Sequence, residues 1–370
     1  MAPIKKYNMM NISYKQLTSV ILLLIGTAIS TYAQTSWYDG TLFPLIGKTS
    51  EQTETRYERL PVSLKEVSRP PVWHLGKNTS GLALRFRSNS THISARWELL
   101  EDVSMNHMTD TGIKGLDLYA WNGRRWQFVN SGRPTAKKNE QVIISGMTPL
   151  EREYMLYLPL YDGVTAISIG VDSLATITPP VLDIPSRKKP MICYGTSITQ
   201  GGCATRAGMS YSNILGRMIN GEVINLGFSG NGQLDYEIAQ IMSARTDAGL
   251  YVLDFIPNVN LEQIREKTAR FVEILRKENK DIPVLFVESI IFPHSFYDRN
   301  IFEIVQAKNK ALREEYEKLK KAGHSNIHYL AATELIGHDG ETTVDGIHLT
   351  DLGFVRMAEE LYKKIEEINP

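Results

Sequence analysis

The spacing of apolar residues changes abruptly about halfway along the chain, and this change limits the possible folds more than any other feature. From Leu82 to Val171, most apolar side chains alternate with polar ones, as at Leu84 and Phe86. A period of two is typical of strands with one buried face. After Pro190 the apolar residues form short continuous runs, which are typical of strands buried on both faces. The two halves are therefore predicted to fold differently.

The first half, residues 34–185, is predicted to be an all-β sandwich of jelly-roll type. Alternating apolar residues recur in three more segments, namely Ile93, Ala95, Trp97 and Leu99; Trp126 and Phe128; and Ile167, Ile169 and Val171. Asn122-Gly123 precedes the second of these, and this dipeptide tolerates the positive φ angles of a tight hairpin turn. Pro179-Pro180 and the segment Pro185–Pro190 break regular structure and suit a domain boundary.

The second half, residues 186–370, is predicted to be an α/β domain. Its buried strands are indicated by five apolar runs, Met191–Tyr194, Val223–Leu226, Leu250–Leu253, Val284–Val287 and Ile327–Leu330. Apolar residues on one helical stripe predict two helices, through Leu261, Ile264, Thr268, Phe271 and Leu275, and through Phe354, Met357, Leu361 and Ile365. Alternating strands and helices predict a parallel sheet covered on both faces. Ligands bind such sheets beyond the carboxyl ends of the strands.

Length and charge fit a two-domain globular protein that does not bind nucleic acid. The chain has 370 residues, whereas a single core stops growing at about 250 residues. Its 41 lysines and arginines balance 41 aspartates and glutamates. No basic excess is left to neutralise phosphates, so a nucleic-acid partner is not expected.

Residues 1–33 are predicted to be a cleaved secretory signal peptide. Lys5, Lys6 and Lys15 precede the apolar stretch Val20–Ile25, and small residues lead to Ala33. The alternative, a membrane anchor, needs about 20 apolar residues, and this run is shorter. We therefore expect an exported protein, periplasmic or secreted, with no membrane span once the signal is removed. Cleavage leaves 38 of the 41 basic residues against all 41 acidic ones.

Cys193 and Cys203 are the only two cysteines, which excludes a disulfide-rich scaffold. An oxidising compartment would allow one bridge between them. Our expectation is instead that both are buried thiols, one beside a strand and one beside a helix start.

Ser197 is the candidate nucleophile. It lies in the segment Gly195–Gly202, directly after the first buried run, where glycines permit a tight turn. Such a loop could instead bind phosphate through backbone N–H groups. However, neither Gly-x-x-x-x-Gly-Lys-Ser/Thr nor Gly-x-Gly-x-x-Gly is present, so nucleotide binding is disfavoured. The Gly-x-Ser-x-Gly elbow of common α/β-hydrolases is also missing.

Asp345 and His348 are the candidate acid and base. A serine hydroxyl needs a base to take its proton, and the base needs an acid to fix its tautomer. The two residues stand three apart in Asp345-Gly346-Ile347-His348, after the last predicted strand and before the last predicted helix. This spacing allows one imidazole nitrogen to face Asp345 while the other faces the serine. An isolated Asp-x-x-His can also be an ordinary surface turn.

Gly230 and Asn258 are candidate donors to an oxyanion. Acyl transfer needs hydrogen-bond donors directed at the developing negative charge, each worth about 3 kcal/mol. Gly230 follows the second apolar run, and Asn258 follows the third. The alternatives are a turn glycine and the N-cap of the helix that begins near Leu261.

Taken together at successive strand ends, these residues resemble the blocks of the SGNH, or GDSL-like, hydrolase superfamily. The resemblance covers residues 186–370 and implies a flavodoxin-like domain. It also implies that Ser197 is the nucleophile, that Ser197, Gly230 and Asn258 form the oxyanion hole, and that Asp345 and His348 complete the triad. Thr196 stands where the family usually has aspartate, and Pro257-Asn258-Val259 replaces Gly-x-Asn-Asp.

The first half resembles a particular bacterial subgroup of that superfamily. Gly115-Leu116-Asp117-Leu118-Tyr119 looks like the Gly-x-Asp-Leu-Tyr signature of a β-sandwich placed before the SGNH domain. In that subgroup the third block reads Leu-Asp-x-x-Pro-Asn, and Leu253–Asn258 matches it.

The resemblance implies an exported serine esterase without metal or organic cofactor. Acylated carbohydrates, carrying acetyl or other small acyl groups, are the substrates that the subgroup suggests. Two alternatives stay open: a lysophospholipase or thioesterase with the same triad, and an inactive carbohydrate-binding protein. The second is motivated by Thr196 and the altered third block.

Several other residues have two interpretations each. His338 and Asp339, with Asp345 and His348, have the residue types of a metal site, but their spacing matches no zinc signature, so no metal is predicted. His107 either hangs from the sandwich toward the cleft or is an ordinary loop histidine. Glu288 either lines a pocket or caps a loop. One tryptophan at most is expected to face a ligand among Trp73, Trp97, Trp121 and Trp126.

Overall fold

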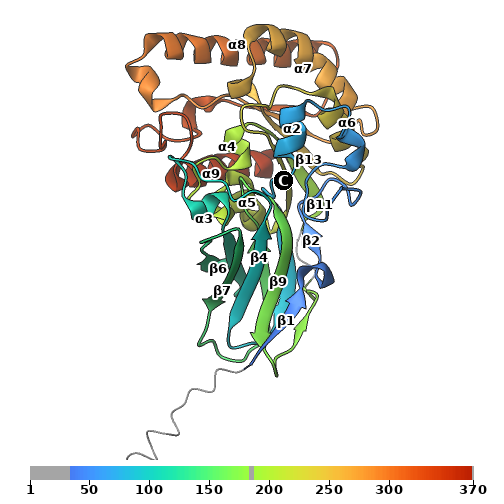
Figure 1. Cartoon of the computed structure of the whole chain (residues 1–370). Coiled ribbons are helices and arrows are strands. Elements are labelled where there is room, and N and C mark those ends of the chain that lie inside the picture. The colour runs from blue at the N-terminus through green and yellow to red at the C-terminus, as the bar shows by residue number, and fades with distance from the viewer. Residues whose placement is uncertain (1–33, 183–186, 369–370) are drawn as a thin grey trace, which may run out of the picture.

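The computed structural model describes residues 34–182 and 187–368. The predicted signal peptide, residues 1–33, lies outside the described residues, as do Pro185 and Ser186 of the predicted boundary. Figure 1 shows a lower half made mainly of antiparallel strands and an upper half in which helices surround a sheet. Among the described residues, no helix combines the length and the apolar character that a membrane span requires.

The lower half is a sandwich of two antiparallel sheets, as predicted. One sheet has the order β1 (Thr35–Asp39), β9 (Val164–Asp172), β4 (Ile93–Leu99) and β7 (Lys138–Ile144). The other has the order β10 (Ile177–Thr178), β3 (Ala83–Ser88), β8 (Arg152–Tyr157), β5 (Leu116–Trp121) and β6 (Trp126–Gly132), and β2 (Leu45–Ile46) pairs with β3. Inward-facing residues of both sheets, including Phe86, Trp97 and Ile169, form one buried core.

The predicted hairpin at Asn122-Gly123 is present. It joins β5 to β6 with Trp121 opposite Trp126, and Gly123 has a φ of +93°. Glycine is favoured there because other residues are strained in this region of backbone conformation.

The upper half contains a five-stranded parallel sheet. Its strands are β11 (Arg187–Gly195), β12 (Gly221–Gly227), β13 (Leu250–Asp254), β14 (Val284–Val287) and β15 (Ile327–Leu330). They lie in the order β12-β11-β13-β14-β15, which numbered from β11 is the 2-1-3-4-5 order of flavodoxin-like folds. The predicted fold class is therefore confirmed.

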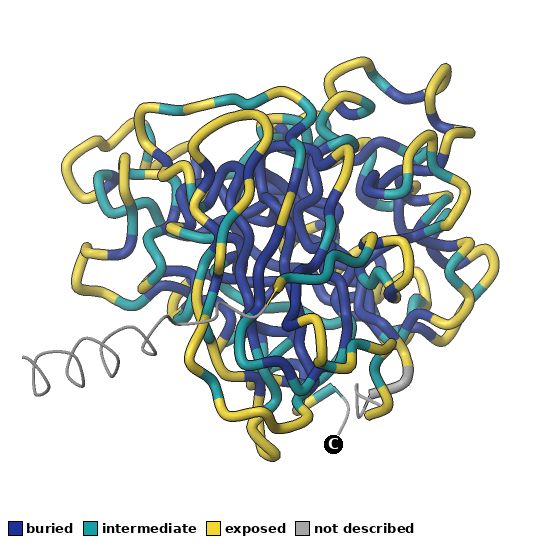
Figure 2. The backbone as a smooth tube through the Cα atoms, turned by 60° about the horizontal axis from the view of Figure 1, so that its bottom comes forward, coloured by how far each residue is buried: buried dark blue, intermediate teal, exposed yellow. Residues whose placement is uncertain are grey.

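Helices cover both faces of this sheet. The long ones are α5 (Tyr211–Met218), α6 (Tyr236–Ala244), α7 (Leu261–Leu275), α8 (Arg299–Lys321) and α9 (Asp351–Ile368). Alternate side chains of β11 point to opposite faces: Met191 and Cys193 join the core under α5 and α9, whereas Ile192 and Tyr194 join the core under α6, α7 and α8. Figure 2 shows buried backbone in the interior of the molecule and exposed backbone around its periphery.

The remaining helices are short. They comprise α2 (Pro70–Leu75), α3 (Asp110–Ile113) and α4 (Ser197–Gln200), with 3-10 turns at Gly40–Leu42, Val62–Leu64, Ala207–Met209, Ile256–Asn258, Pro293–Phe296 and Ala332–Glu334. The two predicted helices correspond to α7 and α9. The longest helix, α8, was not among the predicted ones, although Val305, Leu312 and Leu319 recur every seven residues on its buried side.

The boundary segment needs one correction. Pro185–Pro190 was predicted to break regular structure, but β11 already begins at Arg187 and Pro190 is buried. Pairing with β12 shifts register between Arg187 and Met191. Proline has no N–H to donate, which explains the irregular start, while the Pro190 carbonyl still accepts a 2.8 Å hydrogen bond from Gly249.

The two halves share buried surface. Leu60, Leu64 and Val72, from the irregular segment between β2 and β3, pack in the core under α6 and α7. Figure 1 accordingly shows α2 among the helices of the upper half. Arg59, 1% exposed, donates to the carbonyls of Asn225 (3.1 Å) and Gly227 (2.9 Å) on β12. The sandwich half is thus built into the α/β half.

Candidate active site

The candidate nucleophile lies on a tight turn at the carboxyl end of strand β11, which lies between β12 and β13. Ser197 opens α4, and the Thr196 side chain caps that helix by accepting from the Ile198 N–H at 3.3 Å. A side chain at Gly195 would collide with Thr199 and with the Asp254 carbonyl. The turn therefore packs closely enough to fix the direction of Ser197, whose exposure is 7%.

Asp254 holds this turn through hydrogen bonds inside the α/β half. It ends β13 and is fully enclosed, and its carboxylate accepts from Thr199 Oγ1 at 2.9 Å and from the Tyr211 hydroxyl at 3.3 Å. Burial raises the pKa of Asp254 to about 7, and the two hydroxyl donors only partly oppose this rise. The helix that carries Ser197 thus rests on a carboxyl group that titrates near neutrality.

The structure brings Ser197, His348 and Asp345 together. His348 Nε2 lies 3.0 Å from Ser197 Oγ, and His348 Nδ1 lies 2.7 Å from Asp345 Oδ2. Asp345 Oδ1 accepts from the backbone N–H groups of Ile347 (3.0 Å) and His348 (2.8 Å). Burial alone would raise the pKa of Asp345, but the hydrogen bonds from His348 and Ile347 outweigh it and lower the pKa to about 2. Asp345 is therefore a carboxylate at every ordinary assay pH.

The loop that carries Asp345 and His348 is closed on itself before α9. Thr343 bridges to Leu349, and the Val344 N–H donates to the His348 carbonyl at 2.8 Å. Gly346 adopts a φ of +90°, and the His294 ring fills the space that a side chain there would need. These contacts hold the two side chains on one side of the loop, facing Ser197.

Two loops place the candidate oxyanion donors beside the nucleophile turn. Gly232, two residues after Gly230, packs directly on Gly195 and Thr196, and its N–H donates to Asn258 Oδ1 at 3.1 Å. That bond turns the Asn258 NH₂ group away from Gly232. Within the described parts of the chain, the Asn258 NH₂ and the N–H groups of Ser197 and Gly230 have no hydrogen-bond acceptor. They are free to bind a negatively charged oxygen.

An arginine of the sandwich half braces the Gly230 loop. Arg69, just before α2, donates to both carboxylate oxygens of Asp235, at 2.7 and 3.0 Å. It also donates to the side chain and to the carbonyl of Asn231, each at 2.9 Å. Four hydrogen bonds from one guanidinium fix the residue next to Gly230.

The sandwich half also reaches the nucleophile and the base directly. The Tyr161 hydroxyl donates to the Ser197 carbonyl at 3.3 Å. The ring of His107 lies 5.6 Å from the ring of His348, centre to centre, and His107 is exposed. Of its two interpretations, the structure therefore supports the one in which His107 faces the cleft.

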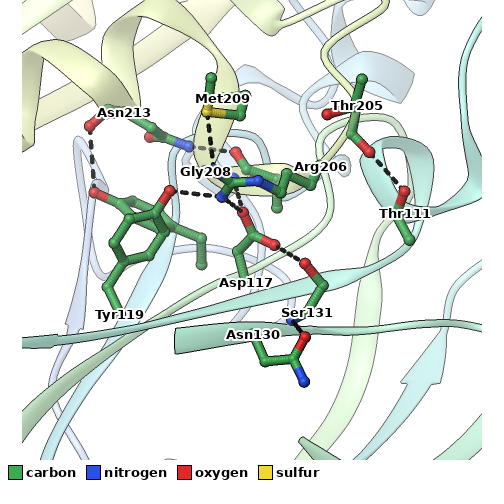
Figure 3. A network of polar contacts seen from close by, with 12 residues as sticks. Thr111, Asp117, Tyr119, Asn130, Ser131, Thr205, Arg206, Gly208, Met209 and Asn213 are labelled. Carbon is green, nitrogen blue, oxygen red and sulfur yellow. Dashed lines mark hydrogen bonds and ion pairs between the residues drawn. The ribbon is translucent and has the colours of Figure 1, made fainter. Parts of the chain in front are cut away.

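The Gly-x-Asp-Leu-Tyr segment is the centre of a polar network between the halves (Figure 3). Asp117, fully buried, accepts from Arg206 (2.6 Å), from Ser131 Oγ (2.6 Å) and from the Gly208 N–H (2.9 Å). Arg206 also donates to the Tyr119 hydroxyl at 2.6 Å. Burial raises the pKa of Asp117, so its charged form depends on these donors. The network holds the loop that follows α4.

Thr205, in the same loop, ties three segments together. Its carbonyl accepts from Thr109 Oγ1 (2.6 Å) and Thr111 Oγ1 (2.5 Å) of the sandwich half. Its N–H and hydroxyl donate to Asp351, which opens α9 three residues after His348. Thr205 thus joins the loop after Ser197 to the start of the helix that follows His348.

Other candidates of the sequence are placed elsewhere. His338 pairs with Glu334 and Asp339 with Arg356, so the group with Asp345 and His348 that had the residue types of a metal site is not assembled. Glu288 accepts from Arg313, Tyr329 and the Ala332 N–H, and it also lines a cavity. Cys193 and Cys203 are both free and buried, as expected. Trp97 and Trp126 are buried in cores.

Arg69, Tyr161, Thr205 and Arg206 were not among the sequence candidates. The Gly-x-Asp-Leu-Tyr motif contains Asp117 and Tyr119, but it does not identify Arg206 as their partner. The partners of these residues lie 36 to 166 residues away in the chain, so no local pattern connects them.

Comparisons with known proteins agree with this architecture. The profile of a family described as GDSL-like lipase/acylhydrolase matches residues 188–366. A second profile, described as the N-terminus of SGNH-hydrolase-type esterases, matches residues 35–177. No curated protein matches the sequence.

Among solved structures, a Bacteroides ovatus protein assigned as a GDSL-like lipase is 34% identical and has a TM-score of 0.86. The match covers 90% of this chain and 98% of that protein. A salicylyl-acyltransferase from a tetracycline biosynthetic pathway is 19% identical, with a TM-score of 0.71 over 90% of this chain and 97% of its own. A family two carbohydrate esterase from Cellvibrio japonicus is 14% identical, with a TM-score of 0.58 over 90% and 98%. The last two show that the fold is shared.

The buried carboxyl of Asp254 predicts a pH-dependent stability. The pKa of Asp254 is about 7 in the folded chain and 3.8 ordinarily, so the folded state binds a proton more tightly than the unfolded state. The stability from this group is full below pH 3.8 and is lost as the pH rises through 7. Asp254→Asn should therefore stabilise the protein more at pH 8 than at pH 4.5, relative to wild type, in urea unfolding.

Asp247→Asn is the control for this measurement. Hydrogen bonds from Arg245 lower the pKa of Asp247, which stays ionised at both pH values. Its substitution should shift stability equally at pH 4.5 and pH 8. The same equal shift for Asp254→Asn would contradict a raised pKa.

The Asp117 network predicts a large stability loss from a single change. Arg206→Met leaves the Asp117 carboxylate buried without its cation, which should lower the free energy of unfolding by about 3 kcal/mol. Arg270→Met removes an exposed ion pair with Glu273 and should change stability by less than about 1 kcal/mol. Urea unfolding of both variants measures the difference, and equal losses would show that the Asp117 charge is compensated in another way.

Proposed function

The chain belongs to the GDSL-like lipase/acylhydrolase family, and from this premise we propose that it is an exported serine esterase that removes acetyl or other small acyl groups from carbohydrates. The family makes it an ester hydrolase. The catalytic residues, the substrate and the export are the parts that we propose.

The observation that carries the mechanism is the continuous hydrogen-bonded line from Ser197 through His348 to Asp345. His348 Nε2, 3.0 Å from Ser197 Oγ, takes the hydroxyl proton as the oxygen attacks the ester carbonyl. Asp345 holds Nδ1 protonated and stabilises the imidazolium that forms. Because the pKa of Asp345 is about 2, its charge is available for this throughout the neutral range.

The free donors around Ser197 stabilise the tetrahedral intermediate. The N–H groups of Ser197 and Gly230 and the NH₂ of Asn258 bind the oxyanion, and the bond from Gly232 to Asn258 Oδ1 presets the amide. His348 then gives its proton to the leaving sugar oxygen, which departs as the alcohol. In the second step His348 takes a proton from water as the water attacks the acyl-enzyme, and it returns this proton to Ser197 Oγ as the carboxylic acid leaves.

A cavity of about 810 Å³ beside the triad loop supports a carbohydrate substrate. Thr342, at the base of that loop, lines it, and so do Phe296 and Tyr297, whose side chains are 85% and 88% exposed. Exposed rings can stack on sugar rings, and Lys310 and Asp339 in the same lining can form hydrogen bonds with sugar hydroxyl groups. The shared fold of the family two carbohydrate esterase is consistent with this class.

Export is supported by the start of the fold. β1 begins at Thr35, two residues after the proposed cleavage at Ala33, so removal of residues 1–33 would leave the folded sandwich complete. The charged, apolar and small-residue regions of the first 33 residues are the pattern of a secretory signal.

Ser197→Ala and His348→Ala should each lower kcat/KM for p-nitrophenyl acetate by at least about a thousandfold, because either change interrupts the same proton relay. Ser145→Ala and His324→Ala, outside the site, are matched controls and should keep wild-type activity. The preferred acyl length is measured by comparing kcat/KM for the acetate, butyrate and octanoate esters of p-nitrophenol. We expect the acetate ester to give the highest value. Activity that survives in Ser197→Ala would overturn the nucleophile assignment, and a preference for octanoate would overturn the small acyl group.

The carbohydrate assignment predicts a selective effect of the exposed rings. The double change Phe296→Ala and Tyr297→Ala should raise KM for acetylated xylo-oligosaccharides about tenfold with kcat nearly unchanged, because it removes binding energy remote from the reacting carbonyl. KM for p-nitrophenyl acetate should not change. Leu174→Ala, which also removes an exposed apolar side chain, serves as the control. Equal KM values for wild type and the double variant on the oligosaccharide would contradict the proposed subsite.

A further inference from the structure

His107, Cys203 and His348 converge at the mouth of the active site from three separate segments. His107 comes from the loop before α3, Cys203 from the turn after α4, and His348 from the loop before α9. Their ligating atoms all lie within 4.8 Å of one another. We propose that these three side chains bind a thiophilic divalent cation, with Zn²⁺ as the representative ion, and that the bound ion inhibits the esterase by occupying His348.

The hydrogen bonds of the two histidines leave the correct ring nitrogen available on each. His348 Nδ1 is held by Asp345 at 2.7 Å, and His107 Nδ1 lies 2.9 Å from Asn106 Oδ1. An acceptor at Nδ1 keeps the proton there and puts the lone pair on Nε2. On His348 this lone pair faces the Ser197 hydroxyl at 3.0 Å, so the metal would displace that hydrogen bond. A histidine with an oxygen acceptor behind it is the usual arrangement of metal-ligating histidines. Both rings therefore have the second-shell partner that such a site needs.

The third ligand is fixed in place by the nucleophile turn. Cys203 is 4% exposed and adopts a φ of +71°. The residues on either side of it are held by backbone hydrogen bonds. The Gly202 N–H donates to the Ser197 carbonyl at 2.7 Å, and the Ala204 N–H donates to the Gly201 carbonyl at 3.1 Å. His107, by contrast, is exposed on a loop. Atoms bound to one tetrahedral zinc lie about 3.5 Å apart. A small movement of His107 toward the two fixed ligands would therefore complete the site.

The donor set selects the class of metal. Two imidazoles and one thiolate suit zinc and similar soft cations rather than Mg²⁺ or Ca²⁺, which prefer oxygen ligands. The thiol binds such a cation as the thiolate, so metal binding releases the thiol proton.

Binding would block the reaction at a defined atom. The lone pair of His348 Nε2 that takes the Ser197 proton is the one that the metal would occupy. The acyl-transfer step then has no base, and each bound ion inactivates one chain. The inhibitory part of this proposal rests on the proposed role of His348, whereas the binding part does not.

The test compares metal binding with inhibition on the mature chain. Zn²⁺ affinity is measured by competition with a chromogenic chelator, and inhibition is measured with p-nitrophenyl acetate at buffered free Zn²⁺. We expect one ion per chain, an inhibition constant equal to the dissociation constant, and full recovery with EDTA. His107→Gln and Cys203→Ser should each weaken both constants at least about tenfold. Cys193→Ala, the other buried free thiol, should leave both unchanged.

A cobalt spectrum identifies the ligands independently of activity. Co²⁺ in this site should give the near-ultraviolet charge-transfer band of a cobalt thiolate, absent in Cys203→Ser and present in Cys193→Ala. His107→Gln keeps the test decisive if Cys203→Ser does not fold, because His107 is exposed. Equal affinity in wild type, His107→Gln and Cys203→Ser, or no binding at millimolar Zn²⁺, would overturn the proposal. The two proposals can also fail separately. If Cys203→Ser loses metal binding while Ser197→Ala keeps esterase activity, the metal site is supported and only the esterase mechanism is rejected.

Discussion

The buried ion pair between Asp117 and Arg206 joins the two halves at the point where the active site depends on them. Asp117 is anchored in β5 of the sandwich, and Arg206 belongs to the loop that follows the Ser197 helix. A buried carboxylate is expensive to leave unpaired, so this loop has one strongly favoured position. The neighbouring Thr205 extends the constraint to Asp351 at the start of α9. The Gly-x-Asp-Leu-Tyr segment therefore has a physical role, which is to position the loop after Ser197 against the loop that carries His348.

The opposite side of the site is constrained in a similar way. Arg69 holds the Gly230 loop, while Asp254 holds the nucleophile helix from within the sheet. Ser197 and Asn258 follow β11 and β13, the adjacent strands at which the order of the parallel sheet reverses. Crevices at such switch points are where open α/β sheets bind ligands. The sandwich borders this crevice through Tyr161, which donates to the Ser197 carbonyl, and through His107, whose ring lies beside that of His348.

The packing of the sandwich beside the site also creates the proposed metal-binding group. By carrying His107 over His348, the sandwich completes a group of two imidazoles and a thiol around the proposed base. A proton relay needs an imidazole nitrogen whose second ring nitrogen is held by an oxygen acceptor. A soft cation prefers the same arrangement in its histidine ligands. Catalysis and metal inhibition would then compete for a single lone pair.

The sequence indicated the flavodoxin-like strand order only through its resemblance to the SGNH superfamily. It determined directly the two fold classes, the hairpin at Asn122-Gly123 and the local spacing of Asp345 and His348. These follow from the period of buried residues and from turn chemistry, which act over a few neighbouring residues. Only the tertiary structure decided that Arg206 pairs with Asp117, that Arg69 braces the Gly230 loop, and that His107 and Cys203 meet at His348. Those partners lie far apart in the chain, and their meeting depends on how the sandwich packs against the sheet. A local pattern records which face of an element is buried, but it does not record what that face is buried against.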